Sequence, residues 1–377
     1  MIRSMLSLSL AALVGSSAAL YGTPASADQI REEQWHLRYL KIDEAHRIST
    51  GNGVTVAVVD SGVAMHPDLA GSVLGGHDYV NPSGNGQEDV DGHGTGMAGL
   101  IAAHGSGQKG AMGIAPDAKI LSIRVIKAGF ADIKSGPAIQ WAIAHGAKVI
   151  NISVGGSIDP ATLDALDVAV KADVVIIAAA GNKPRSSGID APAFVPSVVA
   201  VTAIGRDGKL DPISATGPEA DIAAPGKDIE STGLKSGYRV GTGTSDSSAI
   251  VAGAAALIRS KYPELTAPEV VDVLESTADD KGAPGVDNEY GHGVLNIVAA
   301  LKAAGAKSGD STSGNPSASP TITTTPAPLP SATSAAAAPE NDPASNRGSL
   351  IIGVVLGLVV LLGGLATFLA IRRRTGG

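Results

Sequence analysis

The stretch "VTVAVVDSGV", residues 54–63, decides the fold class because a short apolar run in it meets an abrupt turn. Apart from Thr55, residues 54–59 carry no polar side chain, which is typical of a strand buried on both faces. The run ends at Asp60, and a turn containing glycine follows. A strand of this kind predicts a parallel sheet that is covered by helices on both sides.

The same alternation of short apolar runs and helical patterns continues along the chain. Similar runs occur at residues 118–126, 148–154, 173–180 and 197–204. Helical patterns occur at Thr95–His104, Ile133–His145, Pro160–Ala172 and Ser245–Tyr262, and a capping box at 266–269 opens a further helix to about Ser276. We therefore expect an α/β fold with a doubly wound, mainly parallel sheet flanked by helices.

The first 27 residues have the pattern of a secretory signal peptide. Arg3 supplies the positive start, an apolar run extends from Met5 to Leu20, and residues 25–27 form an A-x-A cleavage site. The alternative is an ordinary buried helix. We predict cleavage before Asp28, which leaves an N-terminal extension over residues 28–50.

The C-terminal part has the composition of a tethered stalk. Residues 308–348 are rich in Ser, Thr, Pro and Ala, which predicts a disordered linker. Residues 349–371 contain a run without charges that is long enough to span a bilayer, and three arginines follow at 372–374. We expect a transmembrane helix at 349–371, a cytoplasmic tail at 372–377, and everything upstream outside the cell.

The remaining residues, 51–307, have the length of one α/β domain. The chain contains no cysteine, so it depends on its core without disulfides. Its net charge of −8 argues against nucleic acid as a partner.

Four polar residues stand where ligand sites form in doubly wound sheets, just beyond strands or at helix starts. They are Asp60, His93 in "DGHGTG", Asn182 in "AAAGN" and Ser245 in "GTGTSDSSAIVAG". Each has an ordinary alternative, since Asp, Ser and His cap turns or helices and Asn is common in turns. Together they supply a nucleophile, a base, a carboxylate that orients the base, and an oxyanion donor, which are the parts that acyl transfer to water requires.

The order Asp, His, Ser, with "DSGV", "GHGTGMAG" and "GTS…VAGAAAL", resembles the subtilisin-like serine proteases over roughly residues 50–300. Smaller matches such as "GIAPDAKI", "INISVGGS", "DIAAPG" and "YGHGVLN" occur in the same order. The resemblance implies that 51–307 is a peptidase domain with Asp60, His93 and Ser245 as its catalytic residues. It also implies that Asn182 is the oxyanion donor. His292 in "YGHGVLN" lies near the end of the domain and does not follow an acidic turn at a helix start, so we expect it to have a structural role.

The resemblance assigns the substrate-binding residues as well. Ser153, Val154 and Gly155 match the segment that pairs with substrate backbone, while Ala179, Ala180 and Gly181 match one wall of the pocket for the residue before the scissile bond. The alanines predict a preference for small or modest side chains there. No cofactor is needed, and we assign no metal site: the acidic residues Glu88, Asp89 and Asp91 are expected to shape the turn before His93.

Two features depart from most of the family. Asp246 follows the nucleophile, either as a carboxylate favoured by the helix dipole or as a charge that raises the basicity of His93 or selects basic substrates. The extension at 28–50 is too short for a folded propeptide and resembles that of the mycosins, membrane-anchored subtilases of type VII secretion systems. We therefore expect an enzyme that no propeptide holds inactive.

These observations predict an extracytoplasmic serine endopeptidase, anchored in the cell membrane, that hydrolyses exported proteins and is linked to type VII secretion. The expected partners are protein or peptide substrates, subunits of a membrane secretion complex, and the membrane itself through the C-terminal helix. The alternative is a structural subunit that stabilises such a complex, with catalysis secondary. A nutritional protease fits less well, because such enzymes are usually released.

Overall fold

The computed structural model describes residues 29–107, 109–127, 130–131, 135–155 and 158–309. The chain divides into two units, 1–313 and 314–377, and the described residues all belong to the first. The predicted signal peptide, the membrane helix at 349–371, the tail and nearly all of the linker lie outside the described residues. Within the described part of the chain, no helix has both the length and the apolar character needed to cross a bilayer.

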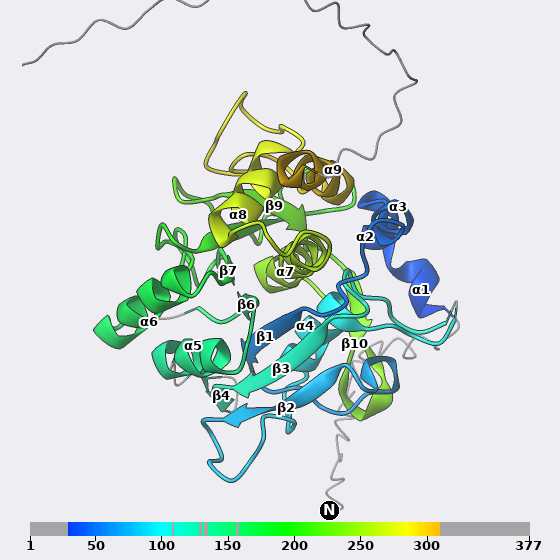
Figure 1. Cartoon of the computed structure of the whole chain (residues 1–377), viewed down its shortest axis with the longest axis vertical. Helices are drawn as coiled ribbons and strands as arrows, with labels where there is room; N and C mark the ends of the chain where they lie inside the picture. Colours follow the sequence, from blue (N-terminus) through cyan, green and yellow to red (C-terminus); the bar gives the residue numbers. More distant parts are fainter. Residues whose placement is uncertain (1–28, 108, 128–129, 132–134, 156–157, 310–377) are drawn as a thin grey trace, which may run out of the picture. The chain divides into compact units, whose positions relative to one another are not determined.

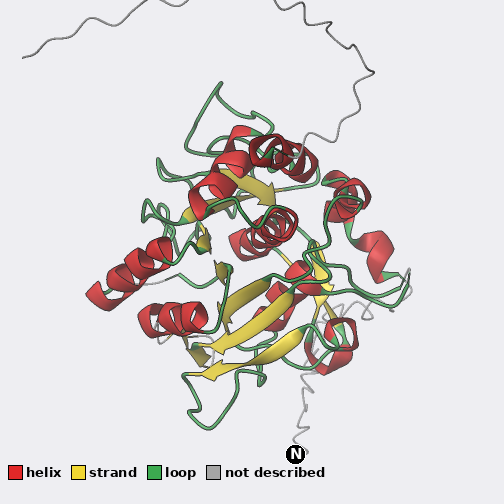
Figure 2. Cartoon of the chain, in the orientation of Figure 1, coloured by secondary structure: helices red, strands yellow, loops and turns green. Residues whose placement is uncertain are grey.

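The central sheet has seven strands in the order β2-β3-β1-β6-β7-β8-β9, and every neighbouring pair is parallel. The strands are β1 (Thr55–Asp60), β2 (Val73–Asp78), β3 (Lys119–Arg124), β6 (Val149–Ile152), β7 (Val175–Ala179), β8 (Val199–Ile204) and β9 (Ile222–Pro225). The prediction of a doubly wound parallel sheet is therefore confirmed. The five predicted strands are present, and β2 and β9 extend the sheet at its two edges (Figure 2).

Two small antiparallel pairs lie outside this sheet. One joins β4 (Ile126–Lys127) to β5 (Phe130–Ala131), and the other joins β10 (Ile229–Thr232) to β11 (Tyr238–Gly241). Two short 3-10 helices, η1 (Pro67–Leu69) and η2 (Leu234–Ser236), occupy loops.

Helices cover both faces of the sheet (Figure 1). On one face lie α4 (His93–Ala102), α7 (Thr244–Lys261), α8 (Ala267–Ser276) and α9 (Ile297–Ser308), and on the other lie α5 (Ser135–Ala144) and α6 (Pro160–Lys171). Along β1, Val56 and Val58 pack toward the first group, whereas Ala57 and Val59 pack toward the second. Because both faces of the strand are buried in apolar core, its sequence is the apolar run described above.

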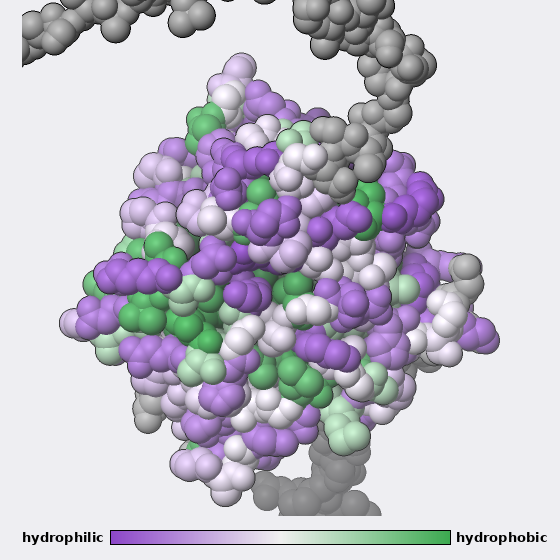
Figure 3. Space-filling view, in the orientation of Figure 1, coloured by the Kyte–Doolittle hydropathy of each residue, from purple (hydrophilic) through white to green (hydrophobic). Residues whose placement is uncertain are grey.

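Helix α6 carries large apolar side chains on its solvent-exposed side. Leu163, Val168 and Val170 remain exposed there, and Figure 3 shows apolar surface over this helix.

Helix α4 begins at His93, two residues earlier than predicted, because a loop carboxylate caps it. Asp89 accepts hydrogen bonds from the N–H groups of Gly92 and Thr95, at 2.8 and 3.0 Å, and from the Thr95 hydroxyl. These bonds satisfy N–H groups that a helix start otherwise leaves unpaired. The expectation that the acidic run shapes this turn is confirmed for Asp89. The capping box of α8 is confirmed too, between Thr266 and Glu269.

Helix α7 runs through the interior, and every residue from Thr244 to Arg259 is buried. Its small residues let neighbours approach closely: a Cβ added at Gly253 would lie 2.6 Å from the Cβ of Ile114. Real Cβ atoms do not approach one another so closely. Glycine at this position therefore lets α7 pack directly against the loop after α4. The position of the N-terminus of α7 is thereby fixed against the sheet.

The N-terminal extension forms three short helices, α1 (Ile30–Glu33), α2 (Trp35–Tyr39) and α3 (Ile42–His46). Their apolar side chains belong to the main core, which the sequence did not predict. Gln34 is fully buried; its amide donates to the carbonyl oxygens of Met112 and Glu230 and accepts from the Met112 N–H. The indole of Trp35 donates to the carbonyl oxygens of Lys227 and Asp228. The extension is thus an integral part of the folded domain.

Replacing Trp35 by Ala should lower the free energy of unfolding by about 3–5 kcal/mol, because a buried aromatic side chain is removed. Chemical denaturation of the purified protein measures this change. Glu44→Ala, at an exposed position of α3, is the matched control and should stay within about 0.5 kcal/mol of the wild type. Equal effects of the two substitutions would show that the extension does not contribute to the core.

Candidate active site

The predicted site residues gather at the carboxyl edge of the sheet, beside the N-termini of α4 and α7. A cleft of about 910 Å³ lies there, and both His93 and Ser245 line it. It is also lined by the loops that follow β6 and β7 and by the segment from β11 to α7. The order of the strands explains this convergence: β1 and β6 are neighbours, and the chain continues from them in opposite directions across the sheet.

Asp60 and His93 form the closest pair in the site. Nδ1 of His93 lies 2.8 and 2.9 Å from the two carboxylate oxygens of Asp60, so it donates to a group that can only accept. Asp60 is fully buried at the end of β1, and its Oδ1 also accepts from the Ser61 N–H at 2.7 Å. The carboxylate therefore fixes the orientation of the ring and leaves Nε2 without a partner among the described residues.

This pairing requires glycine at position 94. A Cβ added there would lie 2.2 Å from the carbonyl oxygen of Gly62 and 3.1 Å from the Cβ of Asp60. Only the absence of a side chain lets the first turn of α4 approach the end of β1 so closely. The hydroxyl of Ser61 accepts from the Gly94 N–H at 2.9 Å and donates to Asp89, which ties the two segments together.

The pKa of His93 is raised above its ordinary value. Burial acts to lower the pKa, but the charge of Asp60 and the hydrogen bond to it favour the protonated ring and outweigh burial. Two further charges act on the ring: Arg239 lowers the pKa and Asp246 raises it. The ring keeps 27% of its side-chain surface exposed, so it remains accessible from the cleft.

Ser245 lies in the first turn of α7 and lines the cleft, but its hydroxyl is not bonded to His93. Instead, Oγ donates to the carbonyl oxygen of Ser153 at 3.2 Å. The turn itself is held by a small polar network: Ser153 Oγ lies 2.9 Å from Ser248 Oγ and accepts from Asn151 Nδ2 at 2.8 Å. Asn151 is a polar residue inside the buried strand β6, and a polar residue in such a strand is the sequence signal for this network.

Asn182 is positioned by the helix start opposite it. Its Oδ1 accepts from the Thr244 N–H at 3.0 Å, and this contact turns the amide NH₂ toward Gly243. A Cβ at Gly243 would lie 3.1 Å from that nitrogen. Within the described residues, neither Asn182 Nδ2 nor the Ser245 N–H donates a hydrogen bond. Two donors are thus free at the N-terminus of α7, where the helix dipole also favours negative charge.

The two predicted substrate-binding segments both line the cleft. Ser153, Val154 and Gly155 follow β6, and Ala179 and Gly181 lie at the end of β7. Ala180 does not line the cleft; its side chain is fully buried, and its backbone bonds to Val201 and Asp190. The structure therefore brings five of these six residues to the cleft.

Asp246 pairs with Arg239, a residue that the sequence did not single out. Its Oδ1 accepts from Nη1 of Arg239 at 2.9 Å, and the side chain of Asp246 is only 2% exposed. Gly96 and Gly241 leave room for the guanidinium, since a Cβ at either would lie within 2.4 Å of it. Asp246 is in the first turn of α7, as the dipole argument required, but its nearest charged partner is this cation.

No group of three or more His, Asp or Glu side chains in the described part of the chain is arranged to hold a metal ion. The oxygens of Asp89 are used by the cap of α4, and Glu88 pairs with Arg124 at 3.0 Å. His292 lies outside the cleft, with Nδ1 3.1 Å from the carbonyl oxygen of Asp221. This position agrees with a structural role.

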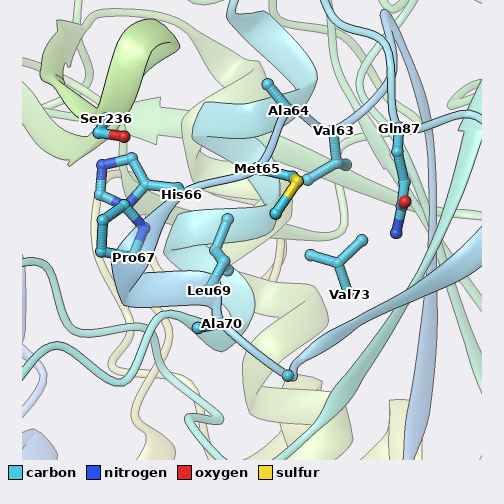
Figure 4. A pocket seen from close by; sticks show the side chains of 11 residues that line it. Val63, Ala64, Met65, His66, Pro67, Leu69, Ala70, Val73, Gln87 and Ser236 are labelled. Carbon is cyan, nitrogen blue, oxygen red and sulfur yellow. The ribbon is translucent and has the colours of Figure 1, made fainter.

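A second, apolar hollow of about 370 Å³ lies under the loop that follows β1 (Figure 4). Val63, Met65, Leu69 and Val73 surround it, with Gln87 on one side. At its edge, both ring nitrogens of His66 already have partners. Nδ1 accepts a hydrogen bond from the Asp68 N–H, and Nε2 contacts the carbonyl oxygen of Gly237. This hollow therefore lacks the acid and base groups found in the cleft.

Comparisons with known proteins agree with this geometry. The model of the Subtilase family matches residues 51–293. Subtilisin E of Bacillus subtilis (strain 168) is 40% identical over 262 residues, which cover 67% of each chain. The minor extracellular protease Epr of the same strain is 34% identical over 271 residues; these are 71% of this chain but only 41% of Epr.

Among solved structures, one similar protein is MycP1, a serine protease described as an essential component of the type VII (ESX-1) secretion system. It superposes with a TM-score of 0.65 at 34% identity, over 71% of this chain and 88% of MycP1. With the matching family model and these relatives, the chain belongs to the subtilase family and is a subtilisin-like serine endopeptidase.

Proposed function

We propose that Asp60, His93 and Ser245 form the catalytic triad of this endopeptidase. The observation that carries the proposal is the bond from His93 Nδ1 to the buried carboxylate of Asp60, because it leaves Nε2 facing the cleft as the available base. Asp60 holds the ring in the required tautomer and stabilises its protonated form. The Ser245 hydroxyl must leave the Ser153 carbonyl and rotate toward Nε2, which then accepts its proton during attack on the substrate carbonyl.

The tetrahedral intermediate develops a negative charge on the former carbonyl oxygen. We assign its stabilisation to Asn182 Nδ2 and the Ser245 N–H, the two free donors beside the nucleophile. Ser153 to Gly155 would hold the substrate backbone as an added strand, and Ala179 and Gly181 would flank the side chain before the scissile bond. The same imidazole would then donate its proton to the leaving amine.

The cellular setting is proposed from the ends of the chain and from the relatives. The uncharged run at 350–371, followed by three arginines, supports a single-pass anchor with the peptidase domain outside the cell. The likeness to MycP1 supports a link to type VII secretion, with exported proteins as substrates. None of the described residues of the extension lines the cleft, which supports an enzyme that its own N-terminus does not block.

A fluorophosphonate probe, which reacts with activated serines, should label the wild-type protein on Ser245. Ser245→Ala should abolish the labelling, whereas Ser197→Ala, at an exposed serine outside the cleft, should not change it. Mass spectrometry of the labelled peptide identifies the site. A wild-type protein that stays unlabelled, or labelling that persists in Ser245→Ala, would contradict the proposed triad.

The same substitution, tested in cells, distinguishes the proposed enzyme from the alternative of a structural subunit. Ser245→Ala expressed in a strain that lacks the gene should fail to restore processing of exported proteins if catalysis is the main role. Secretion that returns to wild-type levels with Ser245→Ala would instead assign the main role to complex stability.

The pair Arg239–Asp246 should tune the base without taking part in the chemistry. Asp246 raises the pKa of His93 and Arg239 lowers it, so the two charges oppose one another at the ring. Because His93 must be neutral to accept a proton, kcat/KM falls as the pH drops below its pKa. Removing one charge at a time should therefore move the acid limb of the profile in opposite directions.

Asp246→Asn should shift the acid limb of kcat/KM to lower pH, and Arg239→Gln should shift it to higher pH. Arg239→Lys, which keeps the charge, is the matched control and should stay closest to the wild type. The profile of kcat/KM against pH, measured with one peptide substrate, gives all three positions. Shifts in the same direction for Asp246→Asn and Arg239→Gln would show that packing, and not charge, links the pair to His93.

A further inference from the structure

A carboxylate that the mechanism does not use stands between the two backbone walls of the cleft. A Cβ added at Gly155 would lie 3.0 Å from Asp190 Oδ2, and one added at Gly181 would lie 2.7 Å from the same oxygen. The two glycines belong to the two segments that line the cleft after β6 and at the end of β7, so this oxygen lies close to both. Neither glycine contributes a side chain at this point, and Asp190 itself lines the cleft.

Asp190 is held in this place by the loop that also carries the proposed oxyanion donor. Its N–H donates to the carbonyl oxygen of Ala180 at 2.9 Å, and Ser186 Oγ donates to its Oδ2. Ser186 is buried and accepts in turn from the Asn182 N–H at 3.1 Å. The position of the carboxylate is therefore coupled to Asn182 by two consecutive hydrogen bonds through Ser186.

The charge of Asp190 is not neutralised within the protein. Two other buried carboxylates have cations as partners: Asp246 has Arg239, and Asp78 has Arg124. Within the described residues, Asp190 has no ion pair, and Oδ1 accepts no hydrogen bond. A half-buried carboxylate with an open acceptor is favourable only when water or a cation completes it.

The distance between the Ser245 hydroxyl and the Asp190 carboxylate favours substrate residues with long side chains. The Ser245 hydroxyl contacts the carbonyl of Ser153, and Asp190 lies against Gly155, two residues further on. Two extended residues span roughly 7 Å. Lys and Arg are the side chains that carry a cation at the end of a stem long enough for this depth.

Three cations also line the cleft. Arg239 is paired with Asp246, whereas the side chains of Lys183 and Arg185 are exposed. Solvent and salt screen exposed charges strongly, whereas the charge of the half-buried Asp190 is screened less. Their repulsion of a basic substrate residue is therefore weaker than the attraction of Asp190.

We propose that Asp190 is a specificity-determining residue that makes this enzyme cleave after Lys or Arg. The proposal rests on the function proposed above and replaces the expectation, drawn from the alanines, of a preference for small side chains. The cation of the substrate residue lies between Gly155 and Gly181 and bonds to the free oxygen of Asp190. Arginine can use both carboxylate oxygens if Ser186 releases Oδ2.

The test compares two fluorogenic peptides that differ only before the scissile bond, one with arginine and one with its neutral isostere citrulline. The full-length protein in detergent should cleave the arginine peptide with a kcat/KM roughly ten- to hundredfold higher, the range for a charge-assisted hydrogen bond. Asp190→Asn should bring this ratio close to one. Asp164→Asn, the same change at an exposed site on α6, should keep the wild-type ratio.

The ratio does not depend on the fraction of active enzyme, and the wild-type value decides the proposal even if Asp190→Asn fails to fold. A wild-type ratio of one or less, or a high ratio that survives in Asp190→Asn, would overturn the role of Asp190. If fluorophosphonate labels Ser245 in that same protein, the proposed function stands and only this inference fails. If neither labelling nor cleavage of either peptide occurs, both fail.

Discussion

The hydrogen bond between the His93 imidazole and the buried carboxylate of Asp60 is the constraint on which the candidate site depends. A carboxylate with no exposed surface must be paired or hydrogen-bonded, because an uncompensated charge in the interior is strongly destabilising. The end of β1, the glycine at position 94 and the cap that Asp89 provides for α4 together bring the ring to this carboxylate. Fold stability and site geometry therefore rest on the same contacts.

The second helix start is placed by a separate set of interactions. Helix α7 is buried along most of its length, so its axis cannot shift without disrupting the core. Its first turn is tied to β6 through Ser153, Ser248 and Asn151, and to the end of β7 through Asn182 and Thr244. The proposed nucleophile and the proposed oxyanion donor are thus held by neighbouring strands of one sheet.

The sequence predicted those features that depend on local patterns. Strands such as residues 54–59 were recognisable because burial on both faces removes polar side chains, and α8 was recognisable from its capping box. Strand β2 was missed because it lies at the edge of the sheet, contains two glycines and is mostly not buried. No apolar run marks a strand of that kind.

The features that were missed in the site arise from tertiary contacts between distant segments. Arg239 contacts Asp246 because Gly241, at the end of β11, leaves room for the guanidinium. The sequence "SGYRVGTG" contains no local pattern that predicts this contact. Asp190 looks like a loop residue in "SSGIDAP" until Gly155 and Gly181 are seen beside it. Likewise, the packing of the short helices of the extension could not be predicted from local patterns. Gln34 and Trp35 bond to backbone groups nearly 80 and nearly 200 residues away.

The most direct measurement of the central claim is ¹⁵N NMR of the imidazole of residue 93 in protein with labelled histidine. At a pH where the ring is neutral, the proton should reside on Nδ1, shared with the carboxylate at the end of β1. Substituting that carboxylate by the corresponding amide should redistribute the proton between the two nitrogens. A neutral ring protonated on Nε2, or a spectrum that this substitution leaves unchanged, would contradict the account.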